Sequence, residues 1–183
     1  MKFFDEVFDP KYIFDLSYML SKKNIWSLNN IANRKSYPNG DIGSHLLLGH
    51  CVFMLEDFDF SYDKELTQKC LETFRYICDF EAKNMHLKEI NLNLQMPAMD
   101  GTFHTDGTDE ETVYIITLSP HEIQKDDGGE FINKTKNETV PFKNGRLIKF
   151  NASDIHKGVA FNKINLARIS LKFRVGEKYD RSN

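Results

Sequence analysis

Two segments in the first half of the chain have apolar residues at helical spacing. In the first, Asp9 can cap a helix and Pro10 suits its first position; apolar residues then recur to about Lys23 at Ile13, Leu16, Met19 and Leu20. The second runs from Asp63 to about Lys83, with apolar residues at Leu66, Cys70, Phe74 and Ile77. The spacing predicts two amphipathic helices and places Cys70 in the core rather than in a reactive site. A short strand is predicted for Ile25 to Leu28.

The pattern changes from helical spacing to alternation after Lys83. Ile90, Leu92, Leu94 and Met96 fall on one face of a strand, and Asn91, Asn93 and Gln95 fall on the other. Further strands are predicted for Val113 to Leu118, Gly129 to Ile132, Arg146 to Phe150 and Ile164 to Val175. In the last of these, Ala167, Ile169, Leu171 and Phe173 form an apolar face for the helices, while Arg168, Ser170 and Lys172 face the other way.

These elements predict one α+β, mainly β domain spanning 1–183. Residues 1–84 are expected to be mostly helical support, and residues 85–175 a β-sandwich or barrel. A length of 183 residues suits a single domain. Loops long enough to be functional are expected at Asn29 to Ser44, a candidate substrate lid, and at Pro97 to Thr102 and His121 to Asp127.

Charge and cysteine content narrow the class of protein. The net charge is -3 and no run of lysines or arginines occurs, which argues against general nucleic-acid binding. The three cysteines are odd in number and form no CxxC motif, so reduced thiols are expected. No signal-peptide pattern and no long apolar stretch is present, which favours the cytoplasm, or the host cytoplasm if a phage encodes the protein, and no membrane contact.

The residues with the clearest chemical potential begin with His104 and Asp106. They stand two apart at the predicted end of a strand, so their side chains project to the same side, and Gly107 marks a turn after them. Such a pair alone is most often only hydrogen-bonded. His156 follows downstream, however, and two histidines with one carboxylate are the set that holds non-haem Fe(II) with open coordination positions. Arg168 and Ser170 on the polar face of the last strand need a partner if buried, and an anion would provide one.

In this order the motifs resemble the small prolyl-4-hydroxylase-like Fe(II)- and 2-oxoglutarate-dependent dioxygenases of bacteria and phages, over about Asn91 to Arg174. The resemblance implies a double-stranded β-helix, or jelly-roll barrel, with N-terminal supporting helices. It makes His104, Asp106 and His156 the iron ligands, and Arg168 with Ser170 the anchor for 2-oxoglutarate. It also implies that Asn93, Gln95 and Tyr114 point toward the co-substrate. Gln95 stands where several relatives have tyrosine. The implied cofactors are Fe(II), 2-oxoglutarate and O2, with ascorbate as a reductant.

The resemblance implies hydroxylation of a C–H bond, and Asp106 favours this over halogenation, since related halogenases lack the carboxylate. A small or peptidyl substrate fits, with a prolyl residue as the leading hypothesis. Asn165 and Leu166 stand where many prolyl hydroxylases place a lysine, which favours the oxygenase class over a specifically prolyl substrate. Two alternatives stay open: a nucleic-acid demethylase of the same fold, and a non-catalytic metal-binding jelly-roll module. Lys172 is expected to be a solvated strand-end lysine, Gly128-Gly129 a tight turn into a strand, and Glu130 structural.

Overall fold

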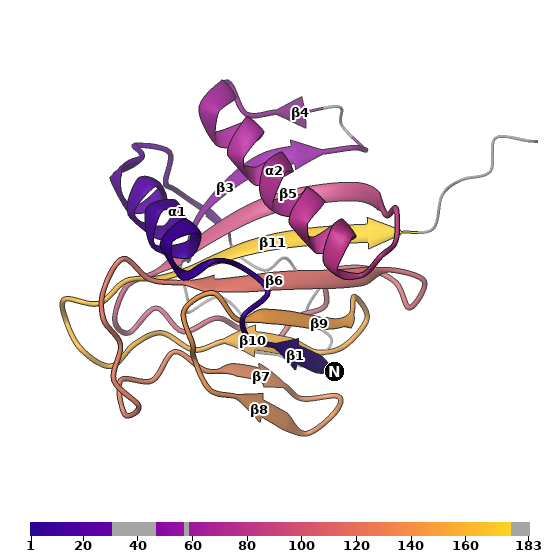
Figure 1. Cartoon of the computed structure of the whole chain (residues 1–183). Coiled ribbons are helices and arrows are strands. Elements are labelled where there is room, and N and C mark those ends of the chain that lie inside the picture. The colour runs from indigo at the N-terminus through magenta and orange to yellow at the C-terminus, as the bar shows by residue number, and fades with distance from the viewer. Residues whose placement is uncertain (31–46, 57–58, 177–183) are drawn as a thin grey trace, which may run out of the picture.

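A computed structural model describes residues 1–30, 47–56 and 59–176. Its larger sheet has the strand order β1 (Lys2–Phe4), β9 (Leu147–Asn151), β6 (Thr112–Leu118), β11 (Arg168–Gly176), β5 (His86–Gln95), β3 (Leu47–Met54) and β2 (Ser27–Asn30), with β4 (Asp59–Phe60) paired to β3. A smaller sheet has the order β10 (His156–Gly158), β7 (Phe131–Asn133) and β8 (Glu138–Val140). Every pairing between these strands is antiparallel. Figure 1 shows the smaller sheet below the larger one and both helices over the strands of the larger sheet.

The two helices begin as the sequence predicts. Helix α1 (Pro10–Lys22) is capped by Asp9, whose carboxylate accepts hydrogen bonds from the amides of Lys11 and Tyr12. Helix α2 (Lys64–Phe80) is capped by Asp63, whose carboxylate accepts a hydrogen bond from the amide of Leu66. This helix ends three residues before the predicted boundary at Lys83. A carboxylate at the cap satisfies amides that have no partner inside the helix and suits the positive end of the helix dipole.

Two apolar clusters hold the layers together. The first lies between the helices and the larger sheet and includes Leu16 and Leu20 of α1, Leu66, Cys70 and Ile77 of α2, and Ile169, Leu171 and Phe173 of β11. The second lies between the two sheets and consists of Val113, Ile115, Phe131, Val140, Ile148, Phe150 and Ala152. The predicted apolar face of the last strand therefore does meet the helices, and Cys70 is buried in that core.

The opposite face of the larger sheet carries the polar residues of two neighbouring strands. In the β5–β11 pair, Arg168 is opposite Gln95, Ser170 is opposite Asn93 and Lys172 is opposite Asn91. Since side chains alternate along a strand, these polar residues share the face turned away from the helices. This pairing sets the position of the candidate site between the sheets.

Several predicted boundaries need correction. The described part of residues 1–84 is not mostly helical, because it also supplies β1 to β4; among these, β3 is a strand of eight residues that was not predicted. The strand expected at Ile25 to Leu28 is β2 and begins at Ser27, and β11 begins four residues later than expected, at Arg168. The candidate lid, Asn29 to Ser44, lies outside the described residues except for its first two, which belong to β2. Among the described residues, neither helix has the length and apolar character required to cross a lipid bilayer.

Candidate metal and co-substrate site

The two histidines of the candidate metal site lie on neighbouring backbone segments. His104 and His156 form an isolated antiparallel bridge, in which each amide donates to the other residue's carbonyl at 3.0 and 2.9 Å. His104 is thus held by one bridge to β10, and not by a strand of its own as expected. The Nδ1 atoms donate to the carbonyl oxygens of Thr102, at 2.7 Å, and Asp154, at 2.8 Å. Because a carbonyl only accepts, this fixes the proton on Nδ1 and leaves each Nε2 free to bind a metal ion.

Both free Nε2 atoms face the carboxylate of Asp106. The Nε2 of His156 is 3.3 Å from Oδ2, and the Nε2 of His104 is 3.6 Å from Oδ1. One ligand atom from each of the three residues lies within 4.8 Å of the others, and no second group of this kind occurs in residues 1–30, 47–56 and 59–176. Oδ2 of Asp106 is buried and accepts no hydrogen bond. Two imidazole nitrogens and an unsatisfied carboxylate oxygen fit a divalent ion of the Fe(II) type.

The charges around this group favour ligation. Burial lowers the pKa of His104 to about 4, and the neighbouring His156 adds to this, so the imidazole is neutral near pH 7. Burial by itself would raise the pKa of Asp106, but the positive charge of Lys172 holds it well below its usual range. A neutral imidazole and an ionised carboxylate are the protonation states that bind metal ions.

Arg168 forms a second polar cluster between the sheets. Its side chain is 1% exposed, its Nε donates to the carbonyl of Gly129 at 3.0 Å, and its Nη1 donates to Gln95 Oε1 at 2.7 Å and to Ser170 Oγ at 2.6 Å. Its Nη2 is buried without a hydrogen-bond partner. Burial lowers the pKa of Arg168 to about 10, while the charge of Glu130 opposes that shift. A buried guanidinium with one nitrogen unused is costly, and an anion bound there would satisfy it.

Gly158, which was not predicted as a site residue, lies between the metal group of His104, Asp106 and His156 and the cluster around Arg168. It lies two residues after His156 on β10, so positions 156 and 158 share one face of the strand. A Cβ atom at position 158 would stand 2.8 Å from Nη1 of Arg168, so no side chain fits there. The carbonyl of Gly158 accepts hydrogen bonds from the Gln95 side chain, at 3.0 Å, and from the amide of Gly101, at 2.8 Å. A glycine two residues after the distal histidine was the only signal in the sequence.

Hydrogen bonds to both the nitrogen and the oxygen of the Gln95 side-chain amide fix its orientation. Its Nε2 donates to the carbonyls of Met99, at 2.9 Å, and Gly158, so its Oε1 is turned toward Arg168. The loop predicted at Pro97 to Thr102 therefore borders this cluster through Met99 and Gly101. Asn93 lies opposite Ser170 on the same face of the sheet, as predicted from the alternation along the strand.

Two predictions about individual residues are wrong. Tyr114 does not point toward the co-substrate: it belongs to the core under the helices, pairs with Phe173 and lies against Lys149, on the opposite face from Arg168. Lys172 is not a solvated lysine. Its side chain is 11% exposed and its Nζ donates to Asp106 Oδ1 and Glu89 Oε1, each at 2.9 Å.

The glycine pair before β7 has the expected role. Gly128 and Gly129 have φ angles of 83° and 86°, a region that favours glycine, and they turn the chain into the strand that begins at Phe131. Gly129 also offers its carbonyl to Arg168, so the turn contributes directly to the arginine cluster.

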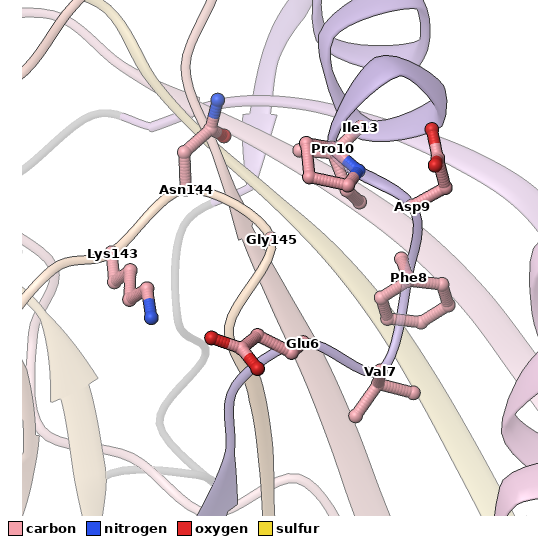
Figure 2. A pocket seen from close by; sticks show the side chains of 9 residues that line it. All are labelled: Glu6, Val7, Phe8, Asp9, Pro10, Ile13, Lys143, Asn144 and Gly145. Carbon is pink, nitrogen blue, oxygen red and sulfur yellow. The ribbon is translucent and has the colours of Figure 1, made fainter.

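A separate surface pocket lies away from this chemistry. Figure 2 shows it between the segment that leads into α1 and a turn in front of β9, with Gly145 of the turn facing Pro10 and Ile13. None of the residues that line it belongs to the metal group or to the arginine cluster, and none of its polar side-chain atoms is buried without a partner. Nothing in the lining indicates a ligand.

Comparison with known proteins gives a clear result for the fold. No protein-family model and no curated protein sequence matches the chain. A prolyl-4-hydroxylase from Pseudomonas putida has a TM-score of 0.66 at 10% identity, covering 97% of this chain and 92% of that one. A prolyl hydroxylase from Trichoplax adhaerens, solved with a peptide of hypoxia-inducible factor, has a TM-score of 0.67 at 10% identity, covering 99% and 85%. An α-ketoglutarate-dependent epimerase of nogalamycin biosynthesis has 0.62 at 12% identity, covering 96% and 77%.

The chain therefore has the jelly-roll fold of the non-haem 2-oxoglutarate oxygenases, including prolyl hydroxylases. This confirms the predicted fold class, α+β and mainly β with supporting helices, over nearly the whole chain rather than over its second half alone. At identities this low the likeness concerns the fold, and the function has to be argued from the site.

Proposed function

We propose that the protein is an Fe(II)- and 2-oxoglutarate-dependent dioxygenase that hydroxylates a C–H bond. His104, Asp106 and His156 would hold the iron. The observation that supports this most strongly is the buried, unpartnered Nη2 of Arg168, because a metal-binding module without a co-substrate has no need for an anion site of this kind. Gly158 and His156 on one short strand bring that anion site next to the metal group.

The residues around Arg168 have separable tasks in this proposal. Arg168 would bind the distal carboxylate of 2-oxoglutarate through its free nitrogen, and charged hydrogen bonds of this kind contribute about 1.5–3 kcal/mol each. Gln95, Ser170 and the Gly129 carbonyl hold the guanidinium plane in place before the co-substrate arrives. Iron, once bound, supplies the chemistry in which O2 converts 2-oxoglutarate to succinate and CO2 and one oxygen atom enters the substrate.

The protein's share in the reaction is orientation and exclusion of water. The Nδ1 hydrogen bonds to Thr102 and Asp154 fix both imidazole rings with Nε2 turned inward. His156 is 2% exposed and packs against the rings of Phe131 and Phe150, with centroids 5.4 and 4.5 Å away. The two phenylalanine rings shield the site from solvent on the side of His156. On the side of His104, the side chain is partly exposed to solvent.

For the substrate we propose a prolyl residue of a peptide, or free proline. Structures of prolyl hydroxylases are among those most similar to this fold, which supports the proposal. The epimerase shows that the same fold also serves other substrates, and Asn165 and Leu166 depart from the prolyl hydroxylase pattern. Specificity in this proposal comes from the loops around the site, among them Pro97 to Thr102.

The test is an aerobic reaction with Fe(II), ascorbate and 2-oxoglutarate. Proline-rich peptides, free amino acids and methylated oligonucleotides are offered in parallel, and both succinate and a mass gain of one oxygen atom are measured. Hydroxylated peptide or proline with matching succinate is the expected result. Turnover confined to methylated oligonucleotides would instead establish a demethylase. Absence of succinate in every reaction, with iron bound, would leave only the metal-binding module.

A further inference from the structure

Lys172 lies directly behind the candidate metal group. Its ammonium nitrogen is 2.9 Å from Oδ1 of Asp106 and 2.9 Å from Oε1 of Glu89, and all three side chains are largely buried. Lys172 is on β11, four residues after Arg168 and on the same face of the strand. One strand thus presents one cation to the co-substrate site and a second to the metal-binding carboxylate.

Glu89, the second partner of the Lys172 ammonium group, is itself held by further buried charges. Glu89 Oε2 accepts from Nε of Arg174 at 2.8 Å, and the side chain of Asn91 also donates to Glu89. Arg174 in turn contacts Glu111 at 3.2 Å. Both carboxylate oxygens of Glu89 are thus hydrogen-bonded, one to Lys172 and the other to Arg174. This fixes the direction of the Lys172 ammonium group and makes it a rigid hydrogen-bond donor.

The contact with Lys172 distinguishes the two oxygens of Asp106. Oδ1 accepts the lysine hydrogen bond, while Oδ2 accepts none and lies 3.3 Å from Nε2 of His156. A carboxylate without such a bond could rotate about its Cβ–Cγ bond. The positive charge of Lys172 would repel a metal ion, but Glu89 balances that charge, so a metal ion meets a neutral lysine–glutamate pair. The effect of Lys172 on the metal site is then the orientation that its hydrogen bond gives to the Asp106 carboxylate.

We propose that Lys172 is a positioning residue that holds the Asp106 carboxylate with Oδ2 toward Nε2 of His156 and so sets the affinity and geometry of the metal site. The inference rests on the proposed function and extends it to a residue that would touch neither the metal nor the co-substrate. Partners in the layer behind a metal ligand commonly change metal affinity by about 10- to 100-fold when removed.

The experiment measures Mn(II) binding without 2-oxoglutarate, from the loss of the electron paramagnetic resonance signal of free Mn(II). Lys172→Met keeps the length and apolar stem of the side chain and removes the donor; it should weaken Mn(II) binding by about 10- to 100-fold. Glu89→Gln keeps the Lys172–Asp106 bond but leaves the charge of Lys172 unbalanced, so the weakening of Mn(II) binding in this variant measures the effect of charge alone. Arg174→Met removes a buried charge from the same network without touching Asp106, so it should lower the unfolding temperature and not the Mn(II) affinity.

Two additional measurements separate orientation from charge and from folding. The double variant Lys172→Met/Glu89→Gln has the net charge of the wild type, leaves no unpaired Glu89, and should still bind Mn(II) weakly. At saturating Co(II), the visible spectrum of the bound metal should shift in Lys172→Met and not in Glu89→Gln. If Lys172→Met does not fold, the double variant decides the question alone.

The contradicting outcomes are distinct. Wild-type affinity in Lys172→Met, tighter binding in it, recovery in the double variant, or equal weakening in Arg174→Met would each overturn the positioning role while leaving the oxygenase proposal intact. A wild-type protein that binds neither Mn(II) nor Co(II) would overturn both.

Discussion

Gly158 lies against Arg168 so closely that a Cβ atom at position 158 would stand 2.8 Å from Nη1 of Arg168 and 2.9 Å from Oε1 of Gln95. Real Cβ atoms essentially never approach this closely, and the neighbours are buried and hydrogen-bonded to each other. The short strand that bears His156 therefore also defines one wall of the anion site. Gly158, which lies against Arg168, is thus only two residues of backbone away from the candidate metal ligand His156.

Gly158→Ala should weaken 2-oxoglutarate binding by about 10- to 100-fold, because it displaces the guanidinium and loses a charged hydrogen bond worth about 1.5–3 kcal/mol. The Mn(II) affinity should stay the same, since His156 keeps its bonds to His104 and Asp154. Calorimetric titration of the Mn(II)-loaded protein with 2-oxoglutarate measures this. An unchanged affinity for the co-substrate would show that Gly158 does not shape the site.

Arg168→Ala should raise the concentration of 2-oxoglutarate needed for half-maximal succinate production, because it removes the buried anion partner and no metal ligand. Arg168→Lys should recover only part of the loss, since an ammonium cannot reproduce the planar fork or reach Gly129, Gln95 and Ser170 together. Succinate production with the wild-type dependence on 2-oxoglutarate in Arg168→Ala would identify another anchor.

The sequence was sufficient where a local pattern determines the structure. Alternation from Ile90 to Met96 identified β5 and its polar face, and Asp9 and Asp63 marked both helix starts. β3 was missed because Leu47 to Met54 shows an irregular apolar run; the register of this strand shifts between Cys51 and Phe53, which breaks the alternation. The fold class followed from the order of the elements, and β3 did not alter it.

The errors at the site have a different origin. On β6 both faces are apolar, with Val113 and Ile115 toward the smaller sheet and Tyr114 and Ile116 toward the helices, so hydrophobicity could not show which way the tyrosine points. Lys172 was misjudged because its partner Asp106 is 66 residues away in the chain. Contacts of that kind depend on how strands pair, and no spacing within the sequence reveals them.

His104→Ala should abolish Mn(II) binding and succinate production while lowering the free energy of unfolding by only about 1 kcal/mol, the net worth of its hydrogen bond to Thr102. Its side chain is 25% exposed, and the ring contact that it loses is the one with His156, at 4.4 Å between centroids. Asp106→Ala should destabilise the protein more, because it removes one of the two carboxylates that neutralise the buried Lys172. Urea denaturation gives both values. A larger loss in His104→Ala than in Asp106→Ala would contradict the assigned environments.

Gly107→Ala should lower the free energy of unfolding by about 1–3 kcal/mol. A Cβ atom at position 107 would overlap the Glu111 carboxylate, which accepts a hydrogen bond from the amide of Thr108 and pairs with Lys88 and Arg174. The substitution would push Glu111 away from these partners and loosen the turn that follows Asp106. Wild-type stability in urea would show that the turn relaxes without cost.

The most direct test of the central claim is an anaerobic absorption titration with Fe(II) and 2-oxoglutarate. A co-substrate chelating iron in this site should give a visible charge-transfer band that saturates with one Fe(II) and one 2-oxoglutarate per chain. His104→Ala should lack the band at any concentration, and Arg168→Ala should require more 2-oxoglutarate to reach it. A wild-type protein that binds Fe(II) at His104, Asp106 and His156 and shows no band at saturating 2-oxoglutarate would contradict the account.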